Sequence, residues 1–217
     1  YGFGWMHLLR SVEMLEKEQY RIGSVTNGSS QQYTITVPQN TAQVKVMLYW
    51  NDPPASLLSS QALVNDLDLT VADPSQSINL PRVLDPTVEG VLNPATTGVD
   101  RINNMEQVVI ENPIPGNYTI NITGMVAENP SQEFFVVYDI IPVSVTLTNP
   151  AGGQSVVPGE TVQVNWDAYG EPTATFKLEY SLDNGASWAL INSSISAAVR
   201  RYEWVVPNKP VSQALVR

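Results

Sequence analysis

Apolar residues change their spacing along this chain from a helical period to a period of two. Between residues 5 and 20, large apolar side chains recur every three or four positions with charged side chains between them. This pattern predicts one amphipathic helix. After Gly23, apolar and polar residues alternate, as they do in strands that are buried on one face. The apolar positions of the predicted helix are Trp5, Leu8, Leu9, Val12 and Leu15.

The alternating segments form two series of predicted strands. The second series starts near Val145 and has turn signals about every eight to twelve residues, a spacing typical of a small β-sandwich of about seven strands. Between Pro74 and Val99 the chain is rich in Pro, Asn, Thr and Gly without a clear period, so we expect a long surface loop there. The predicted strands of the first series lie within residues 33–38, 44–50, 63–74, 107–124 and 134–143.

Composition and charge exclude several chemistries. The 217 residues suffice for one large domain or two of ordinary size. The chain has no cysteine, which excludes disulfide bonds, a thiolate nucleophile and cysteine-ligated zinc. A formal net charge of −10, with 11 Lys and Arg residues, argues against a nucleic-acid partner and suits cations such as calcium. No apolar run approaches the ~20 residues of a membrane-spanning helix, so no membrane span is predicted.

The sequence offers little support for catalysis by this chain. His7 is its only histidine, and Ser11 follows four residues later in the predicted helix. A serine nucleophile needs an imidazole that is itself oriented by a carboxylate, and one helical turn does not create that geometry. We therefore expect His7 to be a surface or packing residue. The sequence also lacks the nucleophile-elbow, metalloprotease, P-loop and EF-hand motifs, so the chain is expected to be non-catalytic.

The acidic residues of the first β-series are more informative. Asp66 and Asp68 are two positions apart, so both side chains face one side of a strand, while Asn65 and Leu67 face the other. Two carboxylates on a half-buried strand are costly without a nearby cation or hydrogen-bond donors. Calcium, which takes six to eight oxygen ligands, is one solution. The other is that Arg101 and backbone amides satisfy these carboxylates, and the sequence leaves both open.

Four sequence blocks carry a resemblance to a known family. They are WNDP at residues 50–53, LVNDLDL at 63–69, NNMEQV at 103–108 and PGNYTI at 115–120. In this order they resemble the C-terminal jelly-roll domain that follows the catalytic domain in a group of secreted alkaline subtilisin-like serine proteases. That domain is a relative of the P-domain of proprotein convertases. The resemblance covers residues 43–138 and departs from the family in the loop at 73–99.

This resemblance implies a jelly-roll β-domain that binds calcium and stabilises a protease domain. The candidate calcium ligands that it implies are side chains with oxygen atoms in the matching segments or next to them. These candidates are Asp52, Asp66, Asp68, Asp100, Asn104 and Glu106.

The start of the chain, YGFGWMHLLRSVEML at residues 1–15, is similar to the end of a subtilase catalytic domain. The similarity implies that the predicted helix packs its apolar side on that upstream domain, and that the catalytic Asp, His and Ser of the parent enzyme precede Tyr1. The expected partners are therefore the chain's own upstream catalytic domain and, beyond it, a protein substrate or a cell-surface glycan. A secreted or cell-surface location follows from the same resemblance.

The second β-series contains SLDNGASW at residues 181–188, which resembles the Asp-box turn of sialidases and other β-hairpins. We expect a structural turn in which Asp183 accepts backbone hydrogen bonds, Gly185 supplies a positive φ and Trp188 packs below. The wider pattern resembles immunoglobulin- or fibronectin-type accessory modules of secreted bacterial proteins. Four aromatic residues offer a sugar-stacking surface, although core packing is the favoured role of aromatics at strand positions. They are Trp166, Trp188, Tyr202 and Trp204.

Taken together, pattern and resemblance predict an all-β fold, a jelly-roll β-sandwich followed by an immunoglobulin-like β-sandwich, with one N-terminal helix. We expect residues 1–23 to be the last helix of a truncated catalytic domain, 24–142 the jelly-roll and 143–217 the second sandwich with an incomplete last strand. The expected function is that of a non-catalytic accessory region of a secreted subtilisin-like serine endopeptidase. A carbohydrate-binding or adhesion module of a secreted or cell-surface protein is the alternative.

Overall fold

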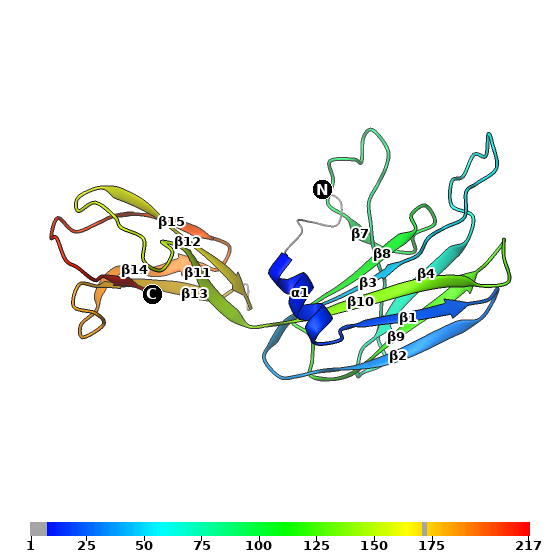
Figure 1. Cartoon of the computed structure of the whole chain (residues 1–217), viewed down its shortest axis with the longest axis horizontal. Helices are drawn as coiled ribbons and strands as arrows, with labels where there is room; N and C mark the ends of the chain where they lie inside the picture. Colours follow the sequence, from blue (N-terminus) through cyan, green and yellow to red (C-terminus); the bar gives the residue numbers. More distant parts are fainter. Residues whose placement is uncertain (1–7, 171–172) are drawn as a thin grey trace. The chain divides into compact units, whose positions relative to one another are not determined.

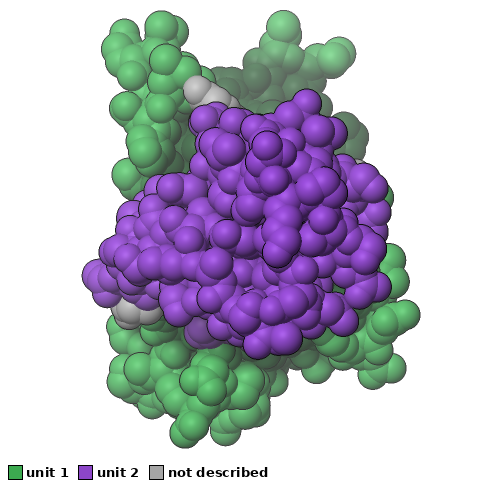
Figure 2. Space-filling view, turned by 90° about the vertical axis from the view of Figure 1, so that its left-hand side faces the viewer, with its two compact units in different colours: residues 1–141 green, residues 142–217 purple. Residues whose placement is uncertain are grey.

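A computed structural model describes residues 8–170 and 173–217 of the chain (Figure 1). The chain divides into two compact units, unit 1 at residues 1–141 and unit 2 at residues 142–217, which Figure 2 colours separately. Antiparallel strands build both units, and the one described helix precedes the first strand. The predicted all-β fold with a single N-terminal helix is therefore confirmed. Among the described residues, no helix is long and apolar enough to cross a membrane.

Unit 1 is a jelly-roll. Its two four-stranded sheets have the orders β1-β10-β3-β8, which we call the β8 sheet, and β2-β9-β4-β5, which we call the β4 sheet. The first and last strands of the unit, β1 and β10, are neighbours in the β8 sheet. The elements are α1 (Leu8–Glu16), β1 (Tyr20–Val25), β2 (Ser30–Val37), β3 (Thr41–Tyr49), β4 (Asp66–Ala72), β5 (Ile78–Asn79), β6 (Arg82–Val83), β7 (Thr96–Thr97), β8 (Met105–Glu111), β9 (Gly116–Met125) and β10 (Gln132–Pro142).

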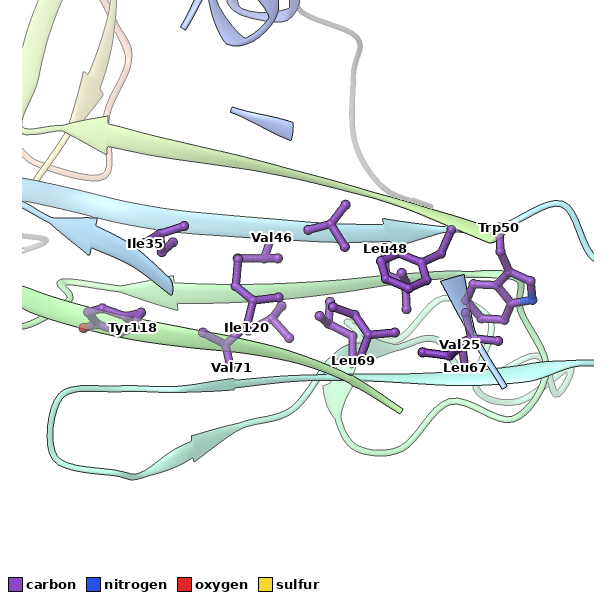
Figure 3. Packing of buried hydrophobic residues seen from close by; sticks show 14 of the residues in the cluster. Val25, Ile35, Val46, Leu48, Trp50, Leu67, Leu69, Val71, Tyr118 and Ile120 are labelled. Carbon is purple, nitrogen blue, oxygen red and sulfur yellow. The ribbon is translucent and has the colours of Figure 1, made fainter. Parts of the chain in front are cut away.

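The core of unit 1 lies between these two sheets and follows from the alternation in the sequence. In β4, Leu67 and Leu69 point inward and are fully buried (Figure 3). Across the core they face Leu48 of β3 and Trp50, which directly follows β3. The Trp50 indole N–H donates to the backbone oxygen of Asn65 at 2.9 Å, so the largest core side chain has its polar atom satisfied. Each fully buried side chain of this kind contributes about 1.5–3 kcal/mol to folding.

The start of unit 1 differs from the sequence prediction. The helix ends at Glu16 instead of continuing to Tyr20, and Tyr20 begins strand β1, which pairs with β10. The sequence pattern did not predict this strand because Gly23 interrupts the alternation of apolar and polar residues. A Cβ at Gly23 would come within 2.6 Å of atoms of Tyr33 and Phe134, so glycine leaves the space that these two rings fill.

The segment at 74–99, predicted to be a loop without regular structure, contains three two-residue strands. β5 extends the β4 sheet, and β6 pairs with β7 as a separate ribbon. Strands this short show no detectable period in a sequence, which explains why the pattern did not reveal them.

The apolar face of α1 lies largely open. Leu8, Leu9, Val12 and Leu15 are between 52% and 68% exposed. Trp5 and His7, which the sequence placed in the same helix, lie outside the described residues. Arg10 of the helix forms an ion pair with Asp139 of β10 at 3.5 Å, which ties the helix to the jelly-roll. The helix thus sits on unit 1 without burying its leucines there.

Unit 2 is a smaller sandwich of two three-stranded sheets with the orders β11-β12-β15 and β14-β13-β16. This arrangement corresponds to strands A-B-E and C′-C-F of an immunoglobulin-like fold. Its core contains Trp166 and Trp204, which are 3% and 9% exposed. The strands are β11 (Ser144–Asn149), β12 (Thr161–Tyr169), β13 (Thr175–Ser181), β14 (Ala189–Ser196), β15 (Arg201–Val205) and β16 (Leu215–Val216).

The Asp-box segment of unit 2 forms the turn between β13 and β14. The Asp183 carboxylate accepts hydrogen bonds from the backbone N–H and the hydroxyl of Ser187 and from the Ser181 hydroxyl. These bonds lower the pKa of Asp183 to about 2. Gly185 has a φ of 91°, a conformation that other residues rarely adopt. All of these contacts lie within the hairpin, which is what a structural turn requires.

Candidate cation site

Two carboxylates stand on the outer face of the β4 sheet. Asp66 and Asp68 alternate with the buried Leu67 and Leu69, and Asn65 faces inward and is fully buried. The alternation of β4 therefore places both aspartates on one side of the strand, as the sequence predicts. This side lies beside the loop that leads from β7 to β8, which carries Arg101.

Arg101 joins the two aspartates through a single nitrogen. Its Nη1 donates to Oδ2 of Asp66 at 2.7 Å and to Oδ1 of Asp68 at 2.8 Å. Burial raises the pKa of Asp66, and the hydrogen bond and positive charge of Arg101 act against this rise. The second oxygen of the Asp66 carboxylate, Oδ1, is buried and has no hydrogen-bond partner among the described residues.

Glu106 completes the group from the opposite sheet. It lies on β8 at an inward position, paired with Leu48 of β3, and is only 1% exposed. Its Oε2 accepts a hydrogen bond from the backbone N–H of Leu69 at 2.6 Å. β5 covers this edge of β4 only at Val71 and Ala72, so the Glu106 carboxyl satisfies a backbone amide that the sheet leaves open.

The environment of Glu106 is costly for a carboxylate. Burial raises the pKa of Glu106 to about 8, and the negative charges of Asp68, Asp100 and Asp66 add to the rise, while the hydrogen bond from Leu69 opposes it. Its other oxygen, Oε1, is buried without a hydrogen-bond partner in the described part of the chain. An unpartnered carboxyl oxygen inside a protein is unfavourable unless something else binds it.

A cavity of about 290 Å³ opens beside these groups, and we call it the edge cavity. Its volume exceeds that of several water molecules, which occupy about 30 Å³ each in the liquid, so a hydrated cation fits. Carboxyl and hydroxyl oxygens and one guanidinium supply the polar part of its wall. These polar side chains belong to Asp68, Thr70, Arg101, Glu106 and Thr123.

The remaining predicted ligands serve the loops around the site. The Asp52 carboxylate accepts hydrogen bonds from the backbone N–H groups of Val64 and Asn65 at 2.7 and 2.8 Å. The Asn104 side chain donates to the backbone oxygen of Trp50 at 2.8 Å. Both side chains therefore fix loop backbone and do not line the edge cavity.

Asp100 fixes the loop that carries Arg101. Its carboxylate accepts hydrogen bonds from the backbone N–H groups of Ile102 and Asn103 at 2.9 and 3.2 Å, and from the Asn103 side chain at 2.7 Å. The structure thus brings Asp66, Asp68 and Glu106 together around Arg101 and keeps Asp100 just behind them. Within residues 8–170 and 173–217, no group of three or more acidic or histidine side chains converges closely enough to hold a metal ion.

We expect Asp52→Ala to lower the free energy of unfolding of unit 1 by about 1–3 kcal/mol, because the N–H groups of Val64 and Asn65 lose a charged acceptor. The loss should be equal in calcium and in chelator, since Asp52 lies outside the edge cavity. Thermal unfolding followed by hydrogen-exchange mass spectrometry of unit 1 peptides measures it. A loss seen only in calcium would instead place Asp52 among the metal ligands.

Asn65 is the important residue that the sequence did not single out. Its side-chain amide donates to the backbone oxygen of Glu128 and to Oε1 of Gln132, at 3.0 and 2.9 Å. Its Oδ1 accepts from the backbone N–H groups of Ala127 and Glu128, at 2.8 and 2.9 Å. The signal was an asparagine at an inward position beside Leu67, where an apolar residue is expected.

The four aromatic residues considered for sugar stacking do not form an open platform. Trp166 and Trp204 lie in the core of unit 2. Trp188 is half-buried under the guanidinium of Arg217, whose carbon lies 3.9 Å from the ring centre. Tyr202 packs at the margin of the same core.

No protein-family model matches the chain, and comparison with curated proteins finds no matching sequence. The assignment of a function therefore rests on the residues and their geometry.

Proposed function

We propose that this chain is the non-catalytic C-terminal accessory region of a secreted subtilisin-like serine endopeptidase, and that its jelly-roll unit binds calcium at the edge cavity and so stabilises the catalytic domain. The observation that carries the metal part is the buried Glu106 carboxyl, whose Oε1 finds no partner among the described residues beside Asp66 and Asp68. The four sequence blocks support the family part.

The chemistry of Glu106 favours a cation over a purely structural role. A glutamine at this position would also accept the Leu69 hydrogen bond, and it would avoid the cost of an ionisable group in the core. A glutamate at this position instead offers a carboxyl group that becomes a charged ligand when a bound cation displaces its proton. Carboxylate and carbonyl oxygens, with water, form the ligand set that calcium prefers, and Asp68 and Glu106 bring carboxylate oxygens to the wall of the edge cavity.

Two of the four resembling blocks meet at this cavity. The block at 63–69 supplies Asp68, which lines the cavity, and the block at 103–108 supplies Glu106 on β8. Asp66 lies beside the cavity and shares Arg101 with Asp68. The block at 50–53 supplies Asp52 and Trp50, which hold the neighbouring loop and core. Three of the four resembling blocks therefore lie at the edge cavity or in the loop and core next to it.

The open face of α1 supports the part of the proposal that concerns a catalytic domain. Four large apolar side chains more than half exposed on one short helix form a surface that is unfavourable in water. In the proposed enzyme, Leu8, Leu9, Val12 and Leu15 pack on the catalytic domain. The helix then connects that domain to β1, which opens the jelly-roll.

We expect millimolar calcium to raise the melting temperature of unit 1 in the full chain relative to the same sample in chelator. A ligand present at 100 times its dissociation constant stabilises the folded state by about 2.7 kcal/mol, which is several degrees for a domain of this size. Hydrogen-exchange mass spectrometry across a temperature series assigns the shift to unit 1. The shift should vanish in Glu106→Gln and persist in Glu111→Gln, an exposed glutamate on the same strand. An unchanged transition in calcium and in chelator would refute calcium binding.

A further inference from the structure

The guanidinium of Arg101 occupies the place among the carboxylates where a bound cation would stand. Its Nη1 lies within 2.8 Å of an oxygen of Asp66 and of Asp68, so one positive point bridges two carboxylates. Arginine binds a carboxylate best through two parallel N–H groups. Here one nitrogen bridges two carboxylates, so Arg101 acts as a positive counter-ion and does not form the two parallel hydrogen bonds of a bidentate pair.

The single positive charge of Arg101 does not satisfy all the carboxyl oxygens of Asp66, Asp68 and Glu106. With Arg101 in place, Oδ1 of Asp66 and Oε1 of Glu106 are still without partners among residues 8–170 and 173–217. A divalent cation carries twice the charge of Arg101 and accepts six to eight oxygens. It could therefore bind oxygens that the guanidinium leaves unsatisfied.

Arg101 can leave without disturbing the loop that carries it. The Arg101 side chain is 47% exposed, so solvent is open to it. Its own backbone oxygen accepts a hydrogen bond from the Gln61 side chain at 3.0 Å. The neighbouring Asp100 carboxylate holds the N–H groups of Ile102 and Asn103. Movement of Arg101 is thus a side-chain event on a fixed backbone.

We infer that Arg101 is a resident counter-ion that competes with calcium for Asp66 and Asp68, so that metal binding expels its side chain into solvent. This inference rests on the proposed calcium site and specifies how that site is regulated. The carboxylates do not converge on a metal while Arg101 stands between them, and they become available when it leaves. The apparent affinity for calcium is lowered by the fraction of time that Arg101 occupies the site.

The test is calorimetric titration of calcium chloride into the chelator-treated full chain, for the wild type, Arg101→Gln and Lys45→Gln. Lys45 lies on β3 in the opposite sheet, so its replacement makes the same change in net charge away from the cavity. If the Arg101 side chain vacates the site about one-tenth to one-fifth of the time, Arg101→Gln tightens calcium binding by about five- to tenfold. Lys45→Gln should change it less than twofold.

The outcomes separate the inference from the function on which it rests. Equal affinities of the wild type and Arg101→Gln, or weaker binding by the variant, overturn the competition and leave the calcium site standing. Binding by Arg101→Gln alone supports the competition and shows that the wild-type site is closed to calcium, which overturns the proposed function. Binding by neither protein overturns both. Thermal unfolding of each variant in chelator checks that it is folded at the titration temperature.

Discussion

Replacing Asn65 with alanine is expected to destabilise unit 1 by about 3–5 kcal/mol, which is a large part of the stability of a typical domain. The Asn65 side chain is fully buried and makes four hydrogen bonds. Alanine would leave the side-chain oxygen of the buried Gln132 without its donor, and the partly buried N–H groups of Ala127 and Glu128 without their acceptor. Each such buried group costs about 1–3 kcal/mol, and neighbouring losses in one network do not add fully.

Protection of the β9 amides against hydrogen exchange measures this loss in the full chain, because these amides lie in the middle of the β4 sheet. The matched control is Asn117→Ala. Asn117 is an exposed asparagine of β9 that accepts one hydrogen bond from the Thr36 hydroxyl, and its loss should cost no more than about 0.5 kcal/mol. Equal protection in the two variants would show that the Asn65 network contributes little to the fold.

The Glu106→Gln variant is expected to be more stable than the wild type by about 2–4 kcal/mol at pH 8 in chelator, and equally stable within about 1 kcal/mol near pH 4.5. The pKa of Glu106 is raised from 4.5 to about 8 in the folded protein. Between these two values the unfolded chain releases the proton and the folded chain keeps it. Wild-type stability from this group therefore falls as the pH rises, by at most about 1.4 kcal/mol per pH unit. Glutamine has no proton to lose, and its carbonyl oxygen still accepts the Leu69 hydrogen bond.

Urea unfolding at half-unit steps from pH 5 to pH 8, with Glu111→Gln as the control, measures this difference. Glu111 is exposed on the same strand and bonded to the Gln43 side chain, so its replacement should give a curve parallel to the wild type. A wild-type curve parallel to that of Glu106→Gln would show that the Glu106 carboxyl titrates normally. The Glu106→Gln variant should also lose calcium binding. Glu106 would therefore lower the stability of the metal-free protein and provide its affinity for calcium.

The sequence predicted those elements whose residues alternate over several positions. β4 and β9 were found because their apolar residues recur at every second place, and the same pattern placed Asp66 and Asp68 together on one face. β1 was missed because a packing requirement, the contact of two rings above Gly23, outweighs strand propensity there. The short strands β5, β6 and β7 form through neighbours distant in the sequence, which no local window contains.

The candidate site shows a similar division. Alternation in β4 orients the aspartates, but it does not reveal whether a metal or Arg101 neutralises them, because Arg101 lies on a loop whose path depends on the whole sandwich. Asp52 and Asn104 lie in the segments that carry the resemblance. Only the three-dimensional structure shows that the Asp52 oxygens accept from backbone N–H groups and that the Asn104 amide group donates to a backbone oxygen. Glu106 was one of the acidic candidates, and its burial became visible only with both sheets assembled.

The pairing of β1 with β10 also sets the order of events during synthesis. Tyr20 is among the first residues of the jelly-roll to leave the ribosome, and its partner Val137 is among the last. The β8 sheet is therefore incomplete until nearly all of unit 1 has emerged, and contacts between such distant residues make folding slow. During that interval the apolar inner faces of the earlier strands are exposed, which makes the incomplete chain prone to aggregation.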